Sequence, residues 1–163
     1  MVNSEYAKIN DFLVNVFNEI LKTEEASLKT GGFQNLSVRE MHVIEAVFDL
    51  QKTNKNTASN IAAAHGITSG TLATAINTLE KKGYVKREPD ERDKRVVRIF
   101  VTEEKGMSAH KWHSLFHHDL VSSVMYAMNH DELKVFVKGL AAVYDFFKDQ
   151  QYKTRNSFFF IHS

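Results

Sequence analysis

Histidines are the residues of this 163-residue chain that most directly suggest chemistry. His113 and His117 are four positions apart, so on a helix they lie on one face, and two imidazoles in that arrangement can bind the same metal ion. A closed zinc site needs four ligands, and the chain has no cysteine. Glu24, Glu25 and His42 are potential further ligands, but the sequence alone does not place them beside this pair.

The neighbouring residues argue against a metal-dependent hydrolase. The zinc-protease motif has Glu directly after its first histidine, whereas Ser114 follows His113. A second interpretation is that His110, His113 and His117 are structural residues at an interface, bonded to carboxylates or to the backbone. A third is contact with an acidic ligand or partner. We favour the second interpretation, and the sequence leaves all three open.

Charges of both signs are concentrated between residues 81 and 98. This segment has eight Lys or Arg and four Asp or Glu residues, a local charge of +4, although the whole chain has a net charge of +1. Cations at the tip of a hairpin are suited to a DNA minor groove, and carboxylates can hold them extended. We predict that Asp90 and Asp93 position Arg92 and Arg95; the alternative is a solubilising charged hairpin.

The elements that would position these charges lie in residues 37–101. A short helix begins at Thr57 and ends at Gly66, and a second begins near Ser69. The segments "YVKRE" and "RVVRIFV" have the composition of β-strands, and the loop between them contains Pro89. Two helices across a tight turn, followed by a two-stranded ribbon, predict a winged helix-turn-helix.

The outer face of the second short helix has small polar side chains that can approach base edges. An alternative is a solvated helix face without function, but the adjoining ribbon favours DNA binding. The predicted DNA contacts, on both helices and on the wing, are Thr57, Ser69, Thr71, Thr74, Asn77, Lys81, Arg92, Lys94 and Arg95.

Long helices with apolar stripes flank this module, within residues 5–30 and 103–150. Thr102 is predicted to cap the first helix of the second segment, with two glutamates in its first turn, and Asn129 to begin the last helix. These stripes exceed what one small module covers, which predicts a homodimer. Residues 151–163 are expected to form a tail, to which we assign no function.

Composition excludes several classes of protein. The absence of cysteine excludes disulfides and thiol-based sensing and favours the reducing cytoplasm. No signal peptide and no stretch of roughly 18 apolar residues is present, so we expect no membrane association. Neither a catalytic motif nor a cofactor motif is found. The predicted fold is mainly α with a small β-wing, as one domain over residues 1–163.

The wing segment "DERDKRVVRIFVTEEKG" and the preceding "TLEKKGYV" resemble the signature of the MarR family of winged helix-turn-helix regulators, with Val101 where Leu is usual. The resemblance covers roughly residues 5–150. It implies a two-fold dimer in which the first and last helices intertwine, and a repressor that binds a pseudo-palindromic double-stranded operator without catalytic residues.

Three further segments, "INDFLVNVFNEIL", "LSVREMHVIEAV" and "AHKWHSLFHHDL", are similar to the FabT-type branch of that family, which represses bacterial fatty-acid synthesis genes. That resemblance implies a long acyl chain on acyl carrier protein as corepressor. Residues compatible with an acyl tunnel, although each is more simply a core residue, are Phe17, Met41, Phe116 and Met125. Other members of the family respond to zinc, so a zinc-responsive regulator using His42, His113 and His117 is the alternative.

Overall fold

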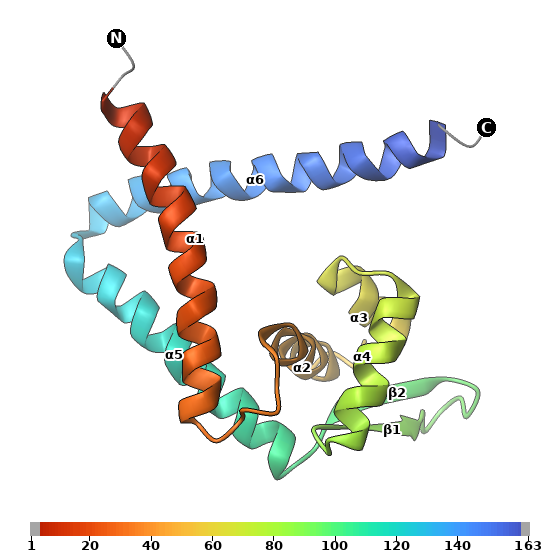
Figure 1. Cartoon of the computed structure of the whole chain (residues 1–163). Helices are drawn as coiled ribbons and strands as arrows, with labels where there is room; N and C mark the ends of the chain where they lie inside the picture. Colours follow the sequence, from red (N-terminus) through yellow and green to blue (C-terminus); the bar gives the residue numbers. More distant parts are fainter. Residues whose placement is uncertain (1–3, 161–163) are drawn as a thin grey trace. The chain divides into compact units, whose positions relative to one another are not determined.

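The computed structural model describes the backbone of residues 4–160 and the side chains of residues 4–150. Within that range the chain forms six helices and one two-stranded antiparallel sheet (Figure 1), which confirms the predicted mainly α fold. In chain order the elements are α1 (Ser4–Thr30), α2 (Val38–Gln51), α3 (Ala58–His65), α4 (Ser69–Lys81), β1 (Val85–Pro89), β2 (Val97–Val101), α5 (Lys105–Ala127) and α6 (His130–Phe160). They divide into two compact units, Met1–His117 and His118–Ser163.

The start of α2 has the predicted capping box. The backbone N–H of Ser37 donates to Glu40 Oε2 at 2.8 Å, and the N–H of Glu40 donates to Ser37 Oγ at 3.2 Å. Lys82, which directly follows α4, donates from Nζ to Glu40 Oε1 at 2.7 Å. The same glutamate therefore begins α2 and holds it against the end of α4.

The turn between α3 and α4 depends on a glycine. Gly66 has φ = 66°, in the left-handed region that side chains rarely adopt, and its N–H caps the end of α3. Thr68 then begins α4 by accepting the N–H of Thr71 at 3.2 Å. The predicted positions of both helices are confirmed: α4 begins at Ser69, and Thr68 is its capping residue.

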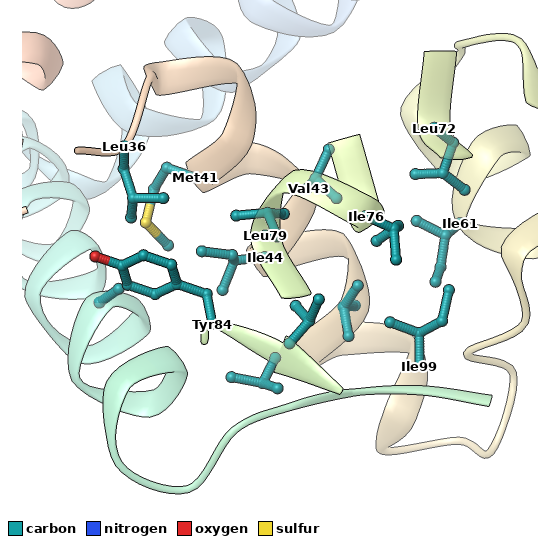
Figure 2. Packing of buried hydrophobic residues seen from close by; sticks show 14 of the residues in the cluster. Leu36, Met41, Val43, Ile44, Ile61, Leu72, Ile76, Leu79, Tyr84 and Ile99 are labelled. Carbon is teal, nitrogen blue, oxygen red and sulfur yellow. The ribbon is translucent and has the colours of Figure 1, made fainter. Parts of the chain in front are cut away.

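One hydrophobic core joins α2, α3, α4 and the hairpin (Figure 2). Ile61 of α3 faces Leu72 and Ile76 of α4, and all three are at most 1% exposed. Burying a side chain of this size stabilises the fold by about 1.5–3 kcal/mol. Further core residues that are fully or almost fully buried are Met41, Ile44, Val47, Leu79, Tyr84, Val85 and Ile99.

The hairpin is tied to the start of α3 through Asn56, which is fully buried. Its Nδ2 donates to the carbonyl oxygen of Ile99 at 2.7 Å, and the N–H of Ile99 donates to the Asn56 carbonyl oxygen at 2.9 Å. Pro89 pairs with Val97 as the last residue of β1, so its predicted place in the loop was wrong. A proline is tolerated there because a strand end does not need its N–H.

Two predicted boundaries near the long helices were also wrong. Helix α5 begins at Lys105, so the two glutamates after Thr102 precede it. Thr102 Oγ donates to the Gly83 carbonyl oxygen at 2.8 Å and accepts the N–H of Gly106, in the first turn of α5, at 2.9 Å. Helix α6 continues past residue 151 to Phe160, since no glycine or proline interrupts that segment.

The start of α6 is as predicted. Asn129 Oδ1 accepts the N–H groups of Asp131 at 3.0 Å and Glu132 at 3.1 Å, and Glu132 Oε2 accepts the N–H of Asn129. The side chains of the apolar segment 158–161 lie outside the described residues. Among the helices that are described, none is long and apolar enough to cross a membrane.

Candidate DNA-binding surface and histidine cluster

Helix α4 has a buried face and an exposed face, as its sequence predicts. Leu72, Ile76 and Leu79 are buried in the core. The exposed residues of the opposite face include five of the predicted DNA contacts, namely Ser69, Thr71, Thr74, Asn77 and Lys81. Thr74 Oγ donates to the Gly70 carbonyl oxygen at 3.2 Å, so its hydroxyl already has a partner within the helix. This face therefore offers small side chains that do not obstruct a close approach to base edges.

A basic residue that the sequence analysis did not single out links the wing to this face. Arg87 of β1 donates from Nη2 to Asn77 Oδ1 at 2.8 Å, and its Nη1 pairs with Glu80. Asn77 is thus oriented by the wing rather than by its own helix. The charge of Arg87 was visible in the sequence, but its pairing with α4 depends on the fold.

At the wing, Asp90 organises the loop. Its Oδ1 accepts the N–H groups of Arg92 at 2.8 Å and Asp93 at 3.0 Å, and its Oδ2 pairs with the guanidinium of Arg98. These donors, Arg98 first, lower the pKa of Asp90 to about 2. Asp90 therefore positions the backbone of Arg92, while its ionic partner is Arg98 rather than the predicted Arg92.

Asp93 holds the side chain of Arg95, as predicted. Arg95 donates from Nε to Oδ1 and from Nη2 to Oδ2 of Asp93, both at 3.0 Å, a bidentate pair that lowers the pKa of Asp93. The Arg95 side chain is nevertheless 91% exposed. Arg92 and Lys94 are exposed beside it, so the wing tip presents three cations to solvent.

Thr57 lies apart from the exposed α4 face. It is half-buried as the capping residue of α3, and it forms an isolated β-bridge with Arg98 of β2. Its Oγ lies 3.2 Å from Ser59 Oγ. The structure thus places Thr57 between α3 and the wing.

Three histidines surround one carboxylate oxygen in a second region, formed by α1, α2 and α5. Oε1 of Glu24 lies 3.4 Å from Nε2 of His42, 3.4 Å from Nε2 of His113 and 3.6 Å from Nε2 of His117. Glu24 and His113 are each 3% exposed. We call Glu24, His42, His113 and His117 the histidine cluster. Glu25 is not part of it, since it pairs with Lys29 at 3.1 Å.

Glu45 lies on the opposite side of His113. Its Oε1 is 3.4 Å from His113 Nδ1, and both of its oxygens are 3.0 Å from His110 Nδ1. The His110 ring also stacks on Phe48, with ring centroids 3.6 Å apart. His110 is therefore bonded to a carboxylate of its own chain, as the favoured interpretation expects, and its place at an interface stays a prediction.

Charge and burial act in opposite directions in this region. Burial raises the pKa of Glu45. The contacts with His113 and His110 together lower it by more, so the pKa of Glu45 lies below its ordinary value. Burial lowers the pKa of His113, but Glu45 and Glu24 raise it above the ordinary value. Burial and the neighbouring His113 lower the pKa of His117. Both ring nitrogens of His113 are buried without a hydrogen bond of acceptable geometry.

The predicted tunnel residues lie in different environments. Met41 is fully buried in the core, whereas Phe17 is 65% and Met125 57% exposed. Phe116 is half-buried, and its ring lies 5.3 Å from that of His117. Met41 is therefore a core residue of the chain, and the tunnel stays a prediction.

The fold and the exposed surface of α4 and the wing define the class of protein, a winged helix-turn-helix regulator. Residues 40–97 match the model of the MarR family. The chain is 35% identical to the FabT protein of Streptococcus pneumoniae, whose structure was solved in complex with DNA. That likeness has a TM-score of 0.77 and covers 89% of this chain and 99% of FabT. The chain belongs to the MarR family, whose members are transcription regulators and not enzymes.

Two other proteins are more distantly similar. The uncharacterised HTH-type transcriptional regulator YwaE of Bacillus subtilis is 28% identical over 99 residues, which are 61% of this chain and 57% of YwaE. The YusO protein of Bacillus subtilis is 16% identical, with a TM-score of 0.62, over 89% of this chain and 98% of YusO. YusO shows a common fold only.

Proposed function

We propose that this protein is a homodimeric repressor of fatty-acid synthesis genes, with a long acyl chain on acyl carrier protein as its corepressor. The observation that carries the proposal is the 35% identity with FabT over 99% of its length. The sequence segments that resemble the FabT-type branch lie in α1, α2 and α5, outside the α4 and wing surface. The similarity to FabT therefore extends to α1, α2 and α5, the helices in which effector binding would differ between branches of the family.

DNA binding is assigned to α4 and the wing. Helix α4 enters the major groove, with Thr71 and Thr74 facing base edges, and the exposed Arg92 enters the adjacent minor groove. Lys94 contacts phosphate, a contact that adds affinity without sequence information. Asp90 and Asp93 keep the wing in the conformation that this binding requires.

Dimerisation is supported by apolar surface that the single chain leaves exposed. On α1, Phe12 is 55% and Phe17 65% exposed, although both belong to the apolar stripe of that helix. On α6, Val137 is 60% and Tyr144 67% exposed. A second copy that packs on these side chains would remove their apolar surface from water. Such burial stabilises a dimer by about 25 cal/mol per Å² of apolar area. Two copies also match the two half-sites of a pseudo-palindromic operator.

The proposed effector is tested with the full-length protein and DNA fragments from upstream of fatty-acid synthesis genes. Acyl carrier protein loaded with a long chain should tighten operator binding, because a ligand that prefers the DNA-bound form is preferred by it in return. Burial of the chain contributes at most about 0.8 kcal/mol per methylene, so the effect should grow with chain length. Unloaded carrier is the matched control and should change the affinity little.

Two results would contradict the proposal. Operator affinity that does not depend on acyl chain length would show that the acyl chain is not the corepressor. Loss of operator binding on addition of a chelator, together with that flat response, would favour the zinc-responsive alternative.

A further inference from the structure

Arg87 joins the wing to the face of α4 that is assigned to DNA. Its Nη2 donates to Asn77 Oδ1 at 2.8 Å, and its Nη1 pairs with Glu80. Asn77 and Glu80 are three positions apart on α4, so they share a face of the helix and one guanidinium reaches both. The Arg87 and Glu80 side chains are 32% and 39% exposed. A surface ion pair of this kind adds little to stability, which leaves its effect on Asn77 as the larger consequence.

The contact fixes which end of the Asn77 amide is held. A guanidinium has only hydrogen-bond donors, so it binds the oxygen of an amide and not the NH2 group. Oδ1 therefore faces Arg87. The Nδ2 atom has two N–H donors and forms no hydrogen bond with another described residue. Because Asn77 is exposed, Arg87 makes this side chain a donor towards anything that approaches the face of α4.

This orientation favours one base over the others. An Asn side chain that is free at both ends pairs with adenine in the major groove, accepting from N6 and donating to N7. Asn77 is poorly suited to that pairing, because Arg87 engages its Oδ1. Guanine presents two acceptors side by side, O6 and N7, whereas cytosine presents a donor. The two N–H donors of Asn77 Nδ2 therefore match guanine best.

We infer that Arg87 determines the base specificity of Asn77, by holding the amide so that Asn77 donates to guanine at one base pair of each half-site. Arg87 is a positioning residue, since it acts through Asn77. Glu80 binds the second arm of the guanidinium and keeps it directed at α4. The inference rests on the DNA binding by α4 that is proposed above, and it does not depend on the target genes or on the acyl corepressor.

The test selects duplexes from a random DNA pool with the full-length protein, and sequencing gives the preferred base pair at each position. The wild type should select a G·C pair at the position that Asn77 contacts. Asn77→Ala and Arg87→Ala should both lose the preference at this position, and their affinity for the wild-type consensus should fall about 5- to 150-fold. Lys86→Ala is the matched control. It removes the same charge at the neighbouring residue, which pairs with Glu88 at 2.8 Å, and it should keep the wild-type preference at every position.

A double variant separates positioning from the loss of a charge. Once Asn77 is Ala, Arg87→Ala should have no further effect on base preference, because the two residues act as one unit. Circular dichroism checks that each variant is folded. The inference is overturned if Asn77→Ala or Arg87→Ala keeps every wild-type preference, if the two variants lose preference at different positions, or if the pair that they lose is A·T. A wild type that selects no sequence would contradict DNA reading by α4 itself, and the inference with it.

Discussion

The wing and the histidine cluster both bring carboxylates together with cationic or basic side chains, yet they differ in how well the chain satisfies them. At the wing, Asp90 accepts two backbone N–H groups and the Arg98 guanidinium, and Asp93 accepts both arms of Arg95. In the cluster, three imidazoles share one Glu24 oxygen, and His113 has no hydrogen bond. The carboxylates of the wing thus have hydrogen-bond donors within the chain, whereas His113 of the cluster lacks hydrogen-bond partners.

This difference indicates what each region contacts. The carboxylates of the wing are occupied by internal donors, and the remaining cations, Arg92 and Lys94 among them, are exposed. A surface of that kind is suited to an external polyanion such as DNA. Glu24 and His113 of the cluster are instead buried, so these two side chains are not available to a macromolecule.

The largest effect is expected at Asp90, because the comparison makes it the residue that completes the wing. Asp90→Ala removes three contacts and frees the whole tip, so operator affinity should fall by at least as much as for loss of one wing arginine, on the order of 100-fold. Fluorescence titration of a labelled operator measures it. Glu91→Ala, at the exposed neighbouring carboxylate, is the control and should not weaken binding.

Substitutions on the DNA-binding surface should distinguish residues that contact base edges from residues that contact phosphate. Thr71→Ala or Thr74→Ala should weaken operator binding by about 1 kcal/mol and leave binding to random DNA little changed. Lys94→Ala should weaken both and reduce the slope of log affinity against log salt by roughly one. Equal losses on operator and random DNA for the threonine variants would exclude α4 as the reading helix.

The prediction with the smallest consequence at neutral pH concerns the ionisation of Asp90. Its folded pKa is about 2, below its ordinary value of 3.8, so ionised Asp90 stabilises the wing fully above pH 3.8. That contribution is lost as the pH falls through about 2. The carboxyl carbon shift of Asp90, followed by NMR, should have its midpoint near 2. A midpoint near 3.8 would show that the contacts with Arg98, Arg92 and Asp93 do not persist in solution.

The DNA-binding module could be predicted from the sequence because its signals are local. The capping box at Ser37, the turn at Gly66 and the pairing of Asp93 with Arg95 each involve residues within four positions of one another. The partner of Asp90 could not be predicted, because Arg98 is brought to it by the strand register.

The histidine cluster shows the same limit more strongly. The face shared by His113 and His117 follows from helical spacing, but Glu24 comes from α1 and Glu45 from α2. Neither neighbouring glutamate at positions 24 and 25 has a signal that distinguishes it in the sequence. The packing of α1 selects Glu24 for burial and leaves Glu25 exposed.

The central claim is that α4 and the wing form one DNA-binding surface, and Arg92 tests it most directly. Arg92 is exposed at the tip, so Arg92→Ala should leave the protein folded while lowering operator affinity by about 1–3 kcal/mol, or roughly 10- to 100-fold. The measurement is a titration of one labelled operator with both proteins at the same salt concentration, with circular dichroism as the check on folding. Operator affinity equal to that of the wild type would contradict the account, because the wing would then take no part in binding DNA.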